Sequence, residues 1–341
     1  MHFNSIEEIF EAFNKLKVLI IGDVMVDSYL WGKVDRISPE APVPIVDVHK
    51  RESRLGGAGN VAINIHALGA SPVICSVIGE DEDAKTIFSN FESLGISTSG
   101  IITSPSRITT VKHRILSGSQ HMLRIDSEND HPLEVQEEKL LWEKIKEILL
   151  DCQAVIFEDY DKGTITDNII HSTIELANKL NIVTIVDPKK RNFLKYKGAT
   201  LFKPNFKELK EGLKVDIDPA DLDALKSSVE LLKEKLELKG VLLTLSERGV
   251  YIDFNKSKQL LPALQREISD VSGAGDTVIS IAGVCLALGL SPTFIAALSN
   301  LGGGLVCEQV GVVPINKKAL LKEAKKEKLY GTHIEKERSL L

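Results

Sequence analysis

The run Lys17-Val18-Leu19-Ile20-Ile21-Gly22-Asp23 decides the fold, because it is an apolar segment of strand length that ends in a glycine and a carboxylate. Five similar runs follow, at residues 73–78, 154–157, 182–186, 200–202 and 241–245. Segments with the apolar spacing of helices lie between them, at 61–68, 84–94, 135–150, 167–180 and 222–236. This alternation predicts an α/β fold with a mostly parallel sheet, covered by helices on both faces.

Two segments break the alternation. Residues 28–51 carry three prolines and an alternating stretch at 43–48, and residues 107–126 resemble two strands around a Ser-Gly-Ser turn. Both predict β-ribbons, which we expect to form a small lid over the carboxyl edge of the sheet. No linker or repeat divides the chain, so we expect a single domain over residues 1–341, with 317–341 as a solvated terminal helix and tail.

Composition excludes several classes of protein. The 341 residues are 43% hydrophobic and 26% charged, which is typical of a globular chain. A net charge of −6 argues against a nucleic-acid binder. Four cysteines without a CxxC pair indicate reduced thiols, and no apolar leader begins the chain. The uncharged stretch 277–307 is broken by Gly289 and Pro292, so it predicts two buried helices rather than a membrane span. We therefore expect a cytoplasmic protein with no membrane partner.

The sharpest motif is Asp270-Val271-Ser272-Gly273-Ala274-Gly275-Asp276-Thr277, which an apolar helix follows at once. Gly273, Ala274 and Gly275 at a helix start would leave unpaired N–H groups open to a phosphoryl group. Asp276 is placed to accept a proton from a hydroxyl nucleophile. The alternative is that Asp276 only caps the helix, but a cap does not explain the three small residues before it.

A second glycine-rich run is Gly56-Gly57-Ala58-Gly59-Asn60-Val61-Ala62. Residues 57–62 match the G-x-G-x-x-A pattern of dinucleotide-binding folds, with acidic residues about twenty positions later. That pattern needs a strand directly before the first glycine, and the charged residues 50–54 argue against one. We favour a turn that faces a polyhydroxyl ligand, since the amide of Asn60 both donates and accepts hydrogen bonds.

Two further motifs suit a nucleotide and its metal ion. Asn205 and Glu208 share one face of a helix start and offer hard oxygen ligands for Mg²⁺, although Asn-x-x-Glu is also a form of capping box. The turn 244–249 ends a strand with hydroxyls and a glycine, which suits a phosphate or ribose, and a plain hairpin explains it nearly as well.

Three cations lie in the second ribbon. Lys112 and Arg114 are two residues apart on one strand face, and Arg124 lies on the next strand. They are either solvated edge charges or an inward-facing phosphate site. No G-x-x-x-x-G-K-[ST], H-E-x-x-H or H-x-G-H pattern occurs in the chain.

Together, the Gly56–Asn60 and Asp270–Thr277 motifs resemble the paired signatures of the ribokinase-like (PfkB) carbohydrate kinases. Residues 22–27, 36–44, 159–163, 187–189 and 204–208 resemble the D-glycero-β-D-manno-heptose 7-phosphate kinases of that family. The resemblance extends from about residue 17 to 314. It implies a three-layer α/β/α domain with a mostly parallel central sheet and a β-ribbon lid. It also implies either a stand-alone kinase or the kinase half of a longer chain that carries an adenylyltransferase.

The resemblance also implies roles for particular residues. The catalytic base is Asp276, and the anion hole is formed by Gly273, Ala274 and Gly275. The sugar phosphate is contacted by Asp23, Asp27, Gly56, Gly57, Asn60, Lys112, Arg114 and Arg124. The nucleotide is bound by Asn205, Thr244, Ser246, Gly249 and Asn300. Mg²⁺ is held by Glu208 and Asn205, partly through water, and a monovalent cation near Asp270 is a further candidate.

The implied reaction is transfer of a phosphoryl group from Mg·ATP to the C1 hydroxyl of D-glycero-D-manno-heptose 7-phosphate. The product is the β-1,7-bisphosphate, a precursor of ADP-heptose and the lipopolysaccharide core, and a homodimer is expected. Alternatives are another ribokinase-like kinase acting on fructose, ribose or adenosine, an NAD-dependent oxidoreductase, and a non-catalytic sugar-phosphate sensor.

Overall fold

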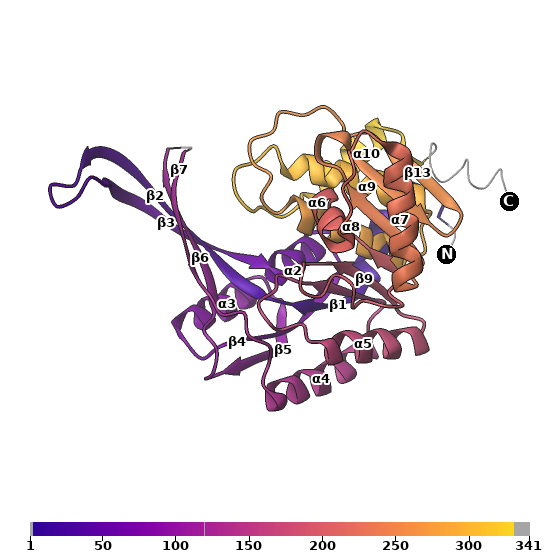
Figure 1. Cartoon of the computed structure of the whole chain (residues 1–341), viewed down its shortest axis with the longest axis horizontal. Helices are drawn as coiled ribbons and strands as arrows, with labels where there is room; N and C mark the ends of the chain where they lie inside the picture. Colours follow the sequence, from indigo (N-terminus) through magenta and orange to yellow (C-terminus); the bar gives the residue numbers. More distant parts are fainter. Residues whose placement is uncertain (1–2, 119, 331–341) are drawn as a thin grey trace.

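The central sheet is built around strand β1 (Lys17–Gly22). The computed structural model describes residues 3–118 and 120–330, and in it nine strands pair in the order β13-β12-β11-β10-β9-β8-β1-β4-β5 (Figure 1). The seven neighbouring strands β11, β10, β9, β8, β1, β4 and β5 are parallel. The two strands at the other edge, β12 and β13, are antiparallel. The remaining strands of this sheet are β4 (Ser71–Gly79), β5 (Ser97–Ser104), β8 (Ala154–Glu158), β9 (Val183–Asp187), β10 (Leu201–Phe202), β11 (Gly240–Thr244), β12 (Val250–Phe254) and β13 (Ser257–Leu261).

Alternate residues of β1 bury two separate cores, one on each face of the sheet. Val18 and Ile20 join the first core, while Leu19 and Ile21 join the second. The first core is covered by α1 (Ile6–Ala12), α2 (Ala58–Ala67), α3 (Glu82–Ser93), α8 (Ala274–Ala287), α9 (Pro292–Val306) and α10 (Lys317–Lys326). The second is covered by α4 (Val135–Leu149), α5 (Asp167–Lys179), α6 (Phe206–Leu213) and α7 (Leu222–Leu236). The predicted three-layer α/β/α fold is confirmed.

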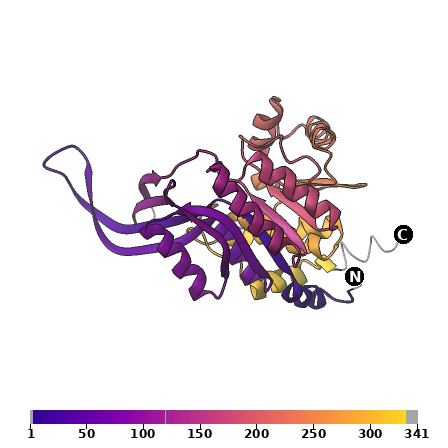
Figure 2. The ribbon, with the colours of Figure 1, turned by 90° about the horizontal axis from the view of Figure 1, so that it is seen from below.

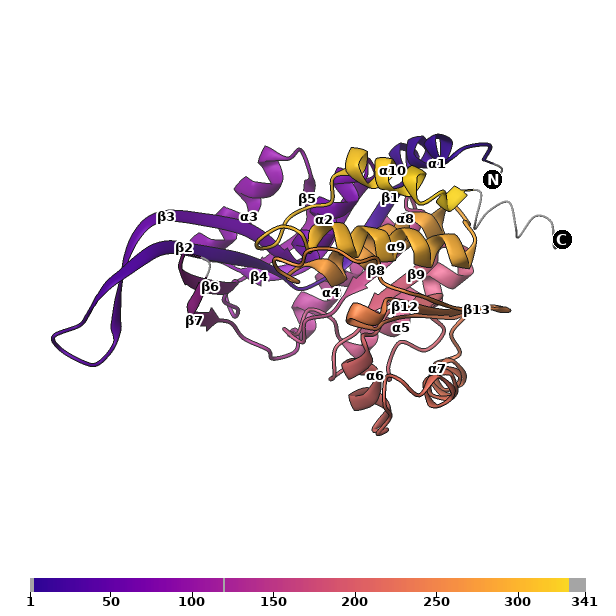
Figure 3. The ribbon, with the colours of Figure 1, turned by 90° about the horizontal axis from the view of Figure 1, so that it is seen from above.

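A second sheet of four strands forms the lid. Its order is β3-β2-β6-β7, with β2 (Val24–Ile37), β3 (Pro44–Gly57), β6 (Thr110–Ser117) and β7 (Gln120–Ser127). Figures 2 and 3 show the β2–β3 hairpin projecting well beyond the body of the molecule. The two predicted ribbons are present, but the first is longer than the predicted 28–51. The sequence does not predict the parallel pairing of β2 with β6 that joins them.

The uncharged segment forms two helices, as predicted. All but three of the residues of α8 are buried, and α9 packs against it. Within the described part of the chain, none of the helices combines the length and apolarity needed to cross a membrane. All four cysteines are buried free thiols. The predicted terminal helix begins at Lys317 but ends at Lys326, and residues 331–341 of the predicted tail lie outside the described residues.

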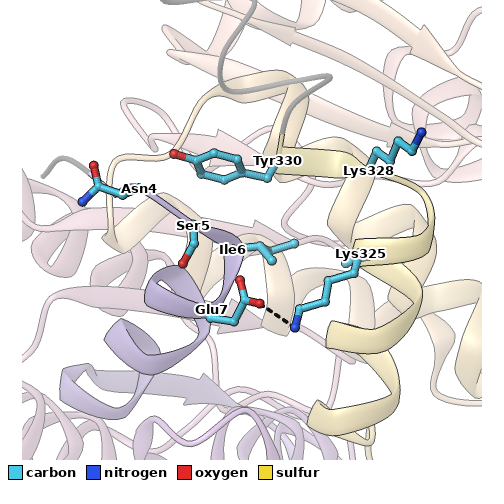
Figure 4. A pocket seen from close by; sticks show the side chains of 8 residues that line it. Asn4, Ser5, Ile6, Glu7, Lys325, Lys328 and Tyr330 are labelled. Carbon is cyan, nitrogen blue, oxygen red and sulfur yellow. Dashed lines mark ion pairs between the residues drawn. The ribbon is translucent and has the colours of Figure 1, made fainter.

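The described ends of the chain meet on one side of the molecule. The start of α1 faces the end of α10, and a cavity of about 300 Å³ lies between them. Figure 4 shows the side chains that line it. Glu7 forms an ion pair with Lys325, and the hydroxyl of Tyr330 donates a hydrogen bond to the carbonyl of Phe3. These contacts hold the terminal helix on the first core. None of the residues that line the cavity is among the predicted site residues.

Candidate active site

Asp276 lies inside the first turn of α8 rather than at its cap. Gly273 occupies the cap position with φ of 79°, a left-handed conformation that favours glycine, and the helix begins at Ala274. The capping alternative for Asp276 is therefore wrong. Because N–H groups of a first helical turn have no helical acceptor, the backbone at 273–276 can receive an anion. The side chain of Asp276 is buried beside this turn.

Two side chains from distant parts of the chain hold the Asp276 carboxylate. The amide of Asn60 on α2 donates to Oδ2 at 2.6 Å, and the hydroxyl of Tyr160 donates to Oδ1 at 3.1 Å. Burial raises the pKa of the Asp276 carboxyl, and the two hydrogen bonds act against that rise. The two hydrogen bonds orient the carboxylate, and burial increases its affinity for a proton. Both properties suit a general base. Asn60 is among the residues predicted for this site, whereas Tyr160 is not.

Behind Asp276 lies a buried cluster of charges. Oxygens of Glu158, Asp187 and Asp276 lie within 4.8 Å of one another, and Lys203 forms an ion pair with Asp187 at 2.8 Å. Burial and the neighbouring Asp187 and Asp276 raise the pKa of Glu158 well above its usual range. Burial acts to lower the pKa of Lys203, but the carboxylates around it raise it overall. Lys203 therefore remains an ammonium that balances the cluster.

These cluster residues were missed as site residues, although a signal for them exists. Glu158 and Asp187 are the last residues of β8 and β9, and Lys203 directly follows β10. Each is a charged residue at the carboxyl end of an apolar parallel strand, where ligands of open α/β sheets bind. The cluster also approaches the anion-binding turn, since a Cβ built on Gly275 would lie 3.6 Å from Nζ of Lys203.

The predicted acceptor side is only partly open to a ligand. The carboxylate of Asp23 already accepts backbone N–H groups of Tyr160, Lys162 and Thr164, at 2.9 to 3.1 Å. Asp23 thus holds the loop after β8 in place. The carboxylate of Asp27 forms an ion pair with Arg114. These two residues organise the walls of the site, and their direct contact with a ligand stays a prediction.

The glycines of the second motif admit these side chains. A Cβ on Gly56 would lie 2.4 Å from Oδ2 of Asp27, so only glycine leaves room for that carboxylate. Gly57 has φ of 57°, and a Cβ there would lie 2.4 Å from the carbonyl oxygen of Asp23. The chain can then turn from β3 directly into α2 and bring Asn60 to Asp276.

This geometry corrects one step of the sequence analysis. Residues 50–54 do not interrupt a strand before the glycines, because β3 extends without a break from Pro44 to Gly57. The dinucleotide pattern fails for a different reason. β3 belongs to the lid sheet and pairs antiparallel with β2, whereas the next strand, β4, lies in the central sheet. The strand and helix therefore do not form a parallel βαβ unit.

The three lid cations have different surroundings. Arg114 pairs with Asp27, and Arg124 pairs with Asp126 on the mostly exposed strand β7. Lys112 is 9% exposed, and no carboxylate of the described chain lies within ion-pair distance of it. Its ammonium lies 4.9 Å from the ring centroid of Tyr160. Burial lowers the pKa of Lys112, because the ammonium is removed from water. Of the three lid cations, it is therefore the one whose charge a bound anion would best stabilise.

Four of the five predicted nucleotide residues line a cavity of about 730 Å³ next to the anion-binding turn, and the fifth, Asn205, is not among its lining residues. Thr244, Ser246 and Gly249 lie on one side, and Asn300 on α9 lies on another. Ala274 and Gly275 of the turn also line it, so the cavity opens onto the start of α8. The hairpin of β11 and β12 is present, as the alternative interpretation of the 244–249 turn expects, and nucleotide binding by this turn stays a prediction.

Asn205 and Glu208 form the capping box of α6, as the alternative interpretation expects. Asn205 caps the N–H of Glu208 at 2.9 Å, and Glu208 accepts the N–H of Asn205 at 2.8 Å. The other oxygen of Glu208 pairs with Lys189 at 2.9 Å. Asn205 forms an isolated bridge with Thr244, so the box lies beside the nucleotide-side strand. A role in metal binding stays a prediction.

Asp270 is held within its own turn. Oδ1 accepts the N–H and hydroxyl of Ser272, and Oδ2 accepts the N–H of Gly311. Burial acts to raise the pKa of Asp270, but these hydrogen bonds lower it overall. The expected monovalent cation near this carboxylate stays a prediction.

Comparison with solved structures supports the fold. The phosphofructokinase-2 from Escherichia coli in complex with potassium matches with a TM-score of 0.76, at 17% identity over 90% of this chain and 97% of that one. A ribokinase from Arabidopsis thaliana complexed with ribose and ATP matches with a TM-score of 0.69, at 16% identity over 90% and 99%. Identities this low establish the fold alone.

Curated relatives are more similar in sequence. The bifunctional protein HldE of Wolinella succinogenes is 40% identical over 294 residues, which cover 86% of this chain and 61% of the relative. That of Syntrophotalea carbinolica is 37% identical over 317 residues, or 93% of this chain and 64% of the relative. The chain therefore spans less than two thirds of their length. The model of the pfkB family of carbohydrate kinases matches residues 15–319, and the chain belongs to that family.

Proposed function

We propose that this carbohydrate kinase transfers the γ-phosphoryl group of ATP to the C1 hydroxyl of D-glycero-D-manno-heptose 7-phosphate. One observation carries the proposal. The buried Asp276 follows the turn that lines a cavity of nucleotide size, and Tyr160 contacts both Asp276 and the buried ammonium of Lys112, which forms no ion pair within the described chain. The product would be the β-1,7-bisphosphate, which fits a role in ADP-heptose and lipopolysaccharide core synthesis.

In the proposed mechanism, Asp276 accepts the proton of the C1 hydroxyl as that oxygen attacks the γ-phosphorus. Asn60 and Tyr160 keep the carboxylate oriented, and the N–H groups at 273–276 face the transferring phosphoryl group. Phosphoryl transfer depends mainly on positioning and on the stabilisation of charge, so no covalent intermediate with the protein is needed. Closure of the lid sheet would exclude water, which otherwise competes as the acceptor.

The residues present fit a magnesium ion held mostly through water. Glu208 offers a carboxylate beside the nucleotide-side strand, but its oxygens already contact Lys189 and the N–H of Asn205. A water shell around the ion suits such an occupied carboxylate, since Mg²⁺ usually retains several waters. Mg²⁺, when bound, neutralises charge on the ATP phosphates. The dependence of turnover on free Mg²⁺ tests this proposal.

Lys112 is proposed to bind the distal 7-phosphate of the acceptor. We expect Lys112→Met to raise the KM for the sugar phosphate by about tenfold or more, because a charge-assisted contact is lost. The KM for ATP should change little. Steady-state kinetics measure both constants. Lys33→Met on the same sheet is the matched control, because Lys33 is exposed and pairs with the exposed Asp35. An equal rise in the KM for the sugar phosphate in the two variants would contradict the assignment of Lys112.

The acceptor is tested by coupled ADP release. Heptose 7-phosphate, fructose 6-phosphate, fructose, ribose and adenosine are supplied side by side at equal concentrations. We expect heptose 7-phosphate to give the highest kcat/KM. A higher value with ribose or adenosine would replace the proposed acceptor and would leave the kinase assignment intact. Absence of NADH binding under the same conditions would count against the oxidoreductase alternative.

We also propose one kinase domain, a homodimer that pairs through the lid, and a cytoplasmic location. The lid carries exposed apolar side chains at Ile37, Val43, Leu123 and Ile125, which a second copy would cover. Light scattering of the full chain measures the oligomeric state, and a monomer at micromolar concentration would contradict the dimer. The free thiols and the use of ATP support a reducing compartment.

A further inference from the structure

Tyr160 lies where the acceptor side, the nucleotide side and the proposed base Asp276 meet. It directly follows Glu158 and Asp159 at the end of β8, and its hydroxyl donates to Oδ1 of Asp276 at 3.1 Å. The side chain is 116 residues from Asp276 in sequence, so the contact depends on the complete fold.

The ring of Tyr160 also contacts two ammonium groups. Nζ of Lys112, on the lid, lies 4.9 Å from the ring centroid, and Nζ of Lys189 lies 5.1 Å from it. Both are within cation–π range. Lys112 belongs to the acceptor side, whereas Lys189 pairs with Glu208 on the nucleotide side. One aromatic ring therefore contacts cations from both substrate sides.

The backbone of this tyrosine is fixed as well. Its N–H donates to Oδ2 of Asp23 at 2.9 Å, and the N–H groups of Lys162 and Thr164 donate to the same carboxylate. Asp23 lies between β1 of the central sheet and β2 of the lid. The loop that carries Tyr160 is thus fastened at the junction of the two sheets.

We propose that Tyr160 is a positioning residue of phosphoryl transfer: its hydroxyl orients the carboxylate of Asp276, and its ring holds Lys112 and Lys189 toward the two substrates. The inference rests on the proposed function, in which Asp276 is the base. Asp276 does the chemistry, and Tyr160 acts through it. The role lies outside the sequence-predicted site and links the lid to the base.

Other groups face the same carboxylate and are unchanged when only the tyrosine hydroxyl is removed. From β8 and β9 these are Glu158 and Asp187, from the residue after β10 it is Lys203, and from α2 it is Asn60. Asp159 lies next to Tyr160, but its own carboxylate accepts from Asn192 and Tyr196. A change caused by Tyr160→Phe therefore reports the bond to Asp276.

The test is the pH profile of kcat for Tyr160→Phe. The variant retains the ring and loses one hydrogen bond that favours the ionised form of Asp276. We expect kcat at neutral pH to fall about tenfold and the acid limb of the profile to move up by about one pH unit. The KM values should stay within about twofold of the wild type. Tyr160→Leu also removes the ring, so it should further raise the KM for the sugar phosphate.

Tyr251→Phe is the matched control. The hydroxyl of Tyr251 is buried on β12 and has no hydrogen-bond partner among the described residues, so its removal should leave the profile unchanged. Thermal melting checks that each variant is folded. A folded Tyr160→Phe enzyme with an unshifted acid limb would overturn the inference, even with a lower kcat, because a merely structural role predicts a uniform loss.

Failure of the proposed function is a separate result. If the wild type prefers another sugar, the same profiles are measured with that sugar, and the shift is still expected. If Asp276→Asn retains activity, the base assignment fails and the inference fails with it. If Asp276→Asn is inactive and only the Tyr160 shift is missing, the proposed function stands and the positioning role is rejected.

Discussion

Replacing Asp276 with Asn is expected to lower kcat by roughly a hundredfold or more, because a positioned general base contributes about that factor. Asn retains the size of the side chain and can still contact Asn60 and Tyr160, but it cannot accept the proton of the C1 hydroxyl. The affinity for ATP should be retained, since the nucleotide cavity is lined by other residues. Coupled ADP release measures kcat, and calorimetry measures ATP binding.

Asp167→Asn is the control for this substitution. Asp167 also lies in the first turn of a helix, α5, but it is exposed and pairs with Lys195. Its replacement should leave kcat unchanged. Turnover near the wild-type value in Asp276→Asn would remove Asp276 from the role of base, and loss of ATP binding in that variant would indicate a disturbed helix start instead.

The second large effect is expected at Lys203. Lys203 is 3% exposed, and its ammonium lies among the carboxylates of Asp187, Glu158 and Asp276. Lys203→Met leaves these buried carboxylates without their counter-charge. Loss of one partner of a buried ion pair costs about 3–5 kcal/mol of the free energy of unfolding. Denaturant unfolding measures this difference at neutral pH, and activity should be lost together with the cluster geometry.

The pH dependence gives this prediction its sign. Lys203 acts to lower the pKa values of Glu158 and Asp276, both of which burial raises. Without Lys203 these pKa values rise further, so the folded state binds more protons than the unfolded state. The variant then loses stability as pH rises. Its deficit in the free energy of unfolding, relative to the wild type, should therefore become smaller as the pH is lowered from 8 to about 5.5.

Lys210→Met is the matched control, because Lys210 pairs with the exposed Asp216. It should change the free energy of unfolding by less than about 0.5 kcal/mol. A deficit in Lys203→Met that stays constant with pH would show that lost packing, and not uncompensated charge, explains the destabilisation.

Most of the central sheet could be predicted because its strands are buried on both faces. A buried parallel strand must be apolar along its whole length, and this leaves a local signal in β1, β4, β8, β9 and β11. The edge strand β5 lacks that signal, because it starts with the exposed polar residues Ser97 and Ser99. This strand is therefore absent from the predicted elements. The short helix α6 is also missed beyond its capping residues.

The lid pairing could not be predicted, because nothing local encodes it. β2 and β6 pair in parallel over residues about 85 positions apart, as in Asp27 beside Lys112. The same limit applies to the site. Local motifs pointed to Asp276 and Asn60 as candidate site residues. Tyr160, Glu158 and Lys203 become candidates only in the folded chain, where the carboxyl ends of several strands meet. Their charges look like ordinary strand ends in the sequence.

The junction of the two sheets has a consequence for engineering this enzyme. A single residue, Asp23, separates β1 from β2, and Gly57 passes directly into the helix that carries Asn60. The β2–β3 hairpin is therefore entered and left through elements of the proposed site and not through linkers. An exchange of this hairpin for that of another kinase would displace the proposed catalytic centre, so new acceptor specificity is better sought by replacing single side chains on β6 and β7.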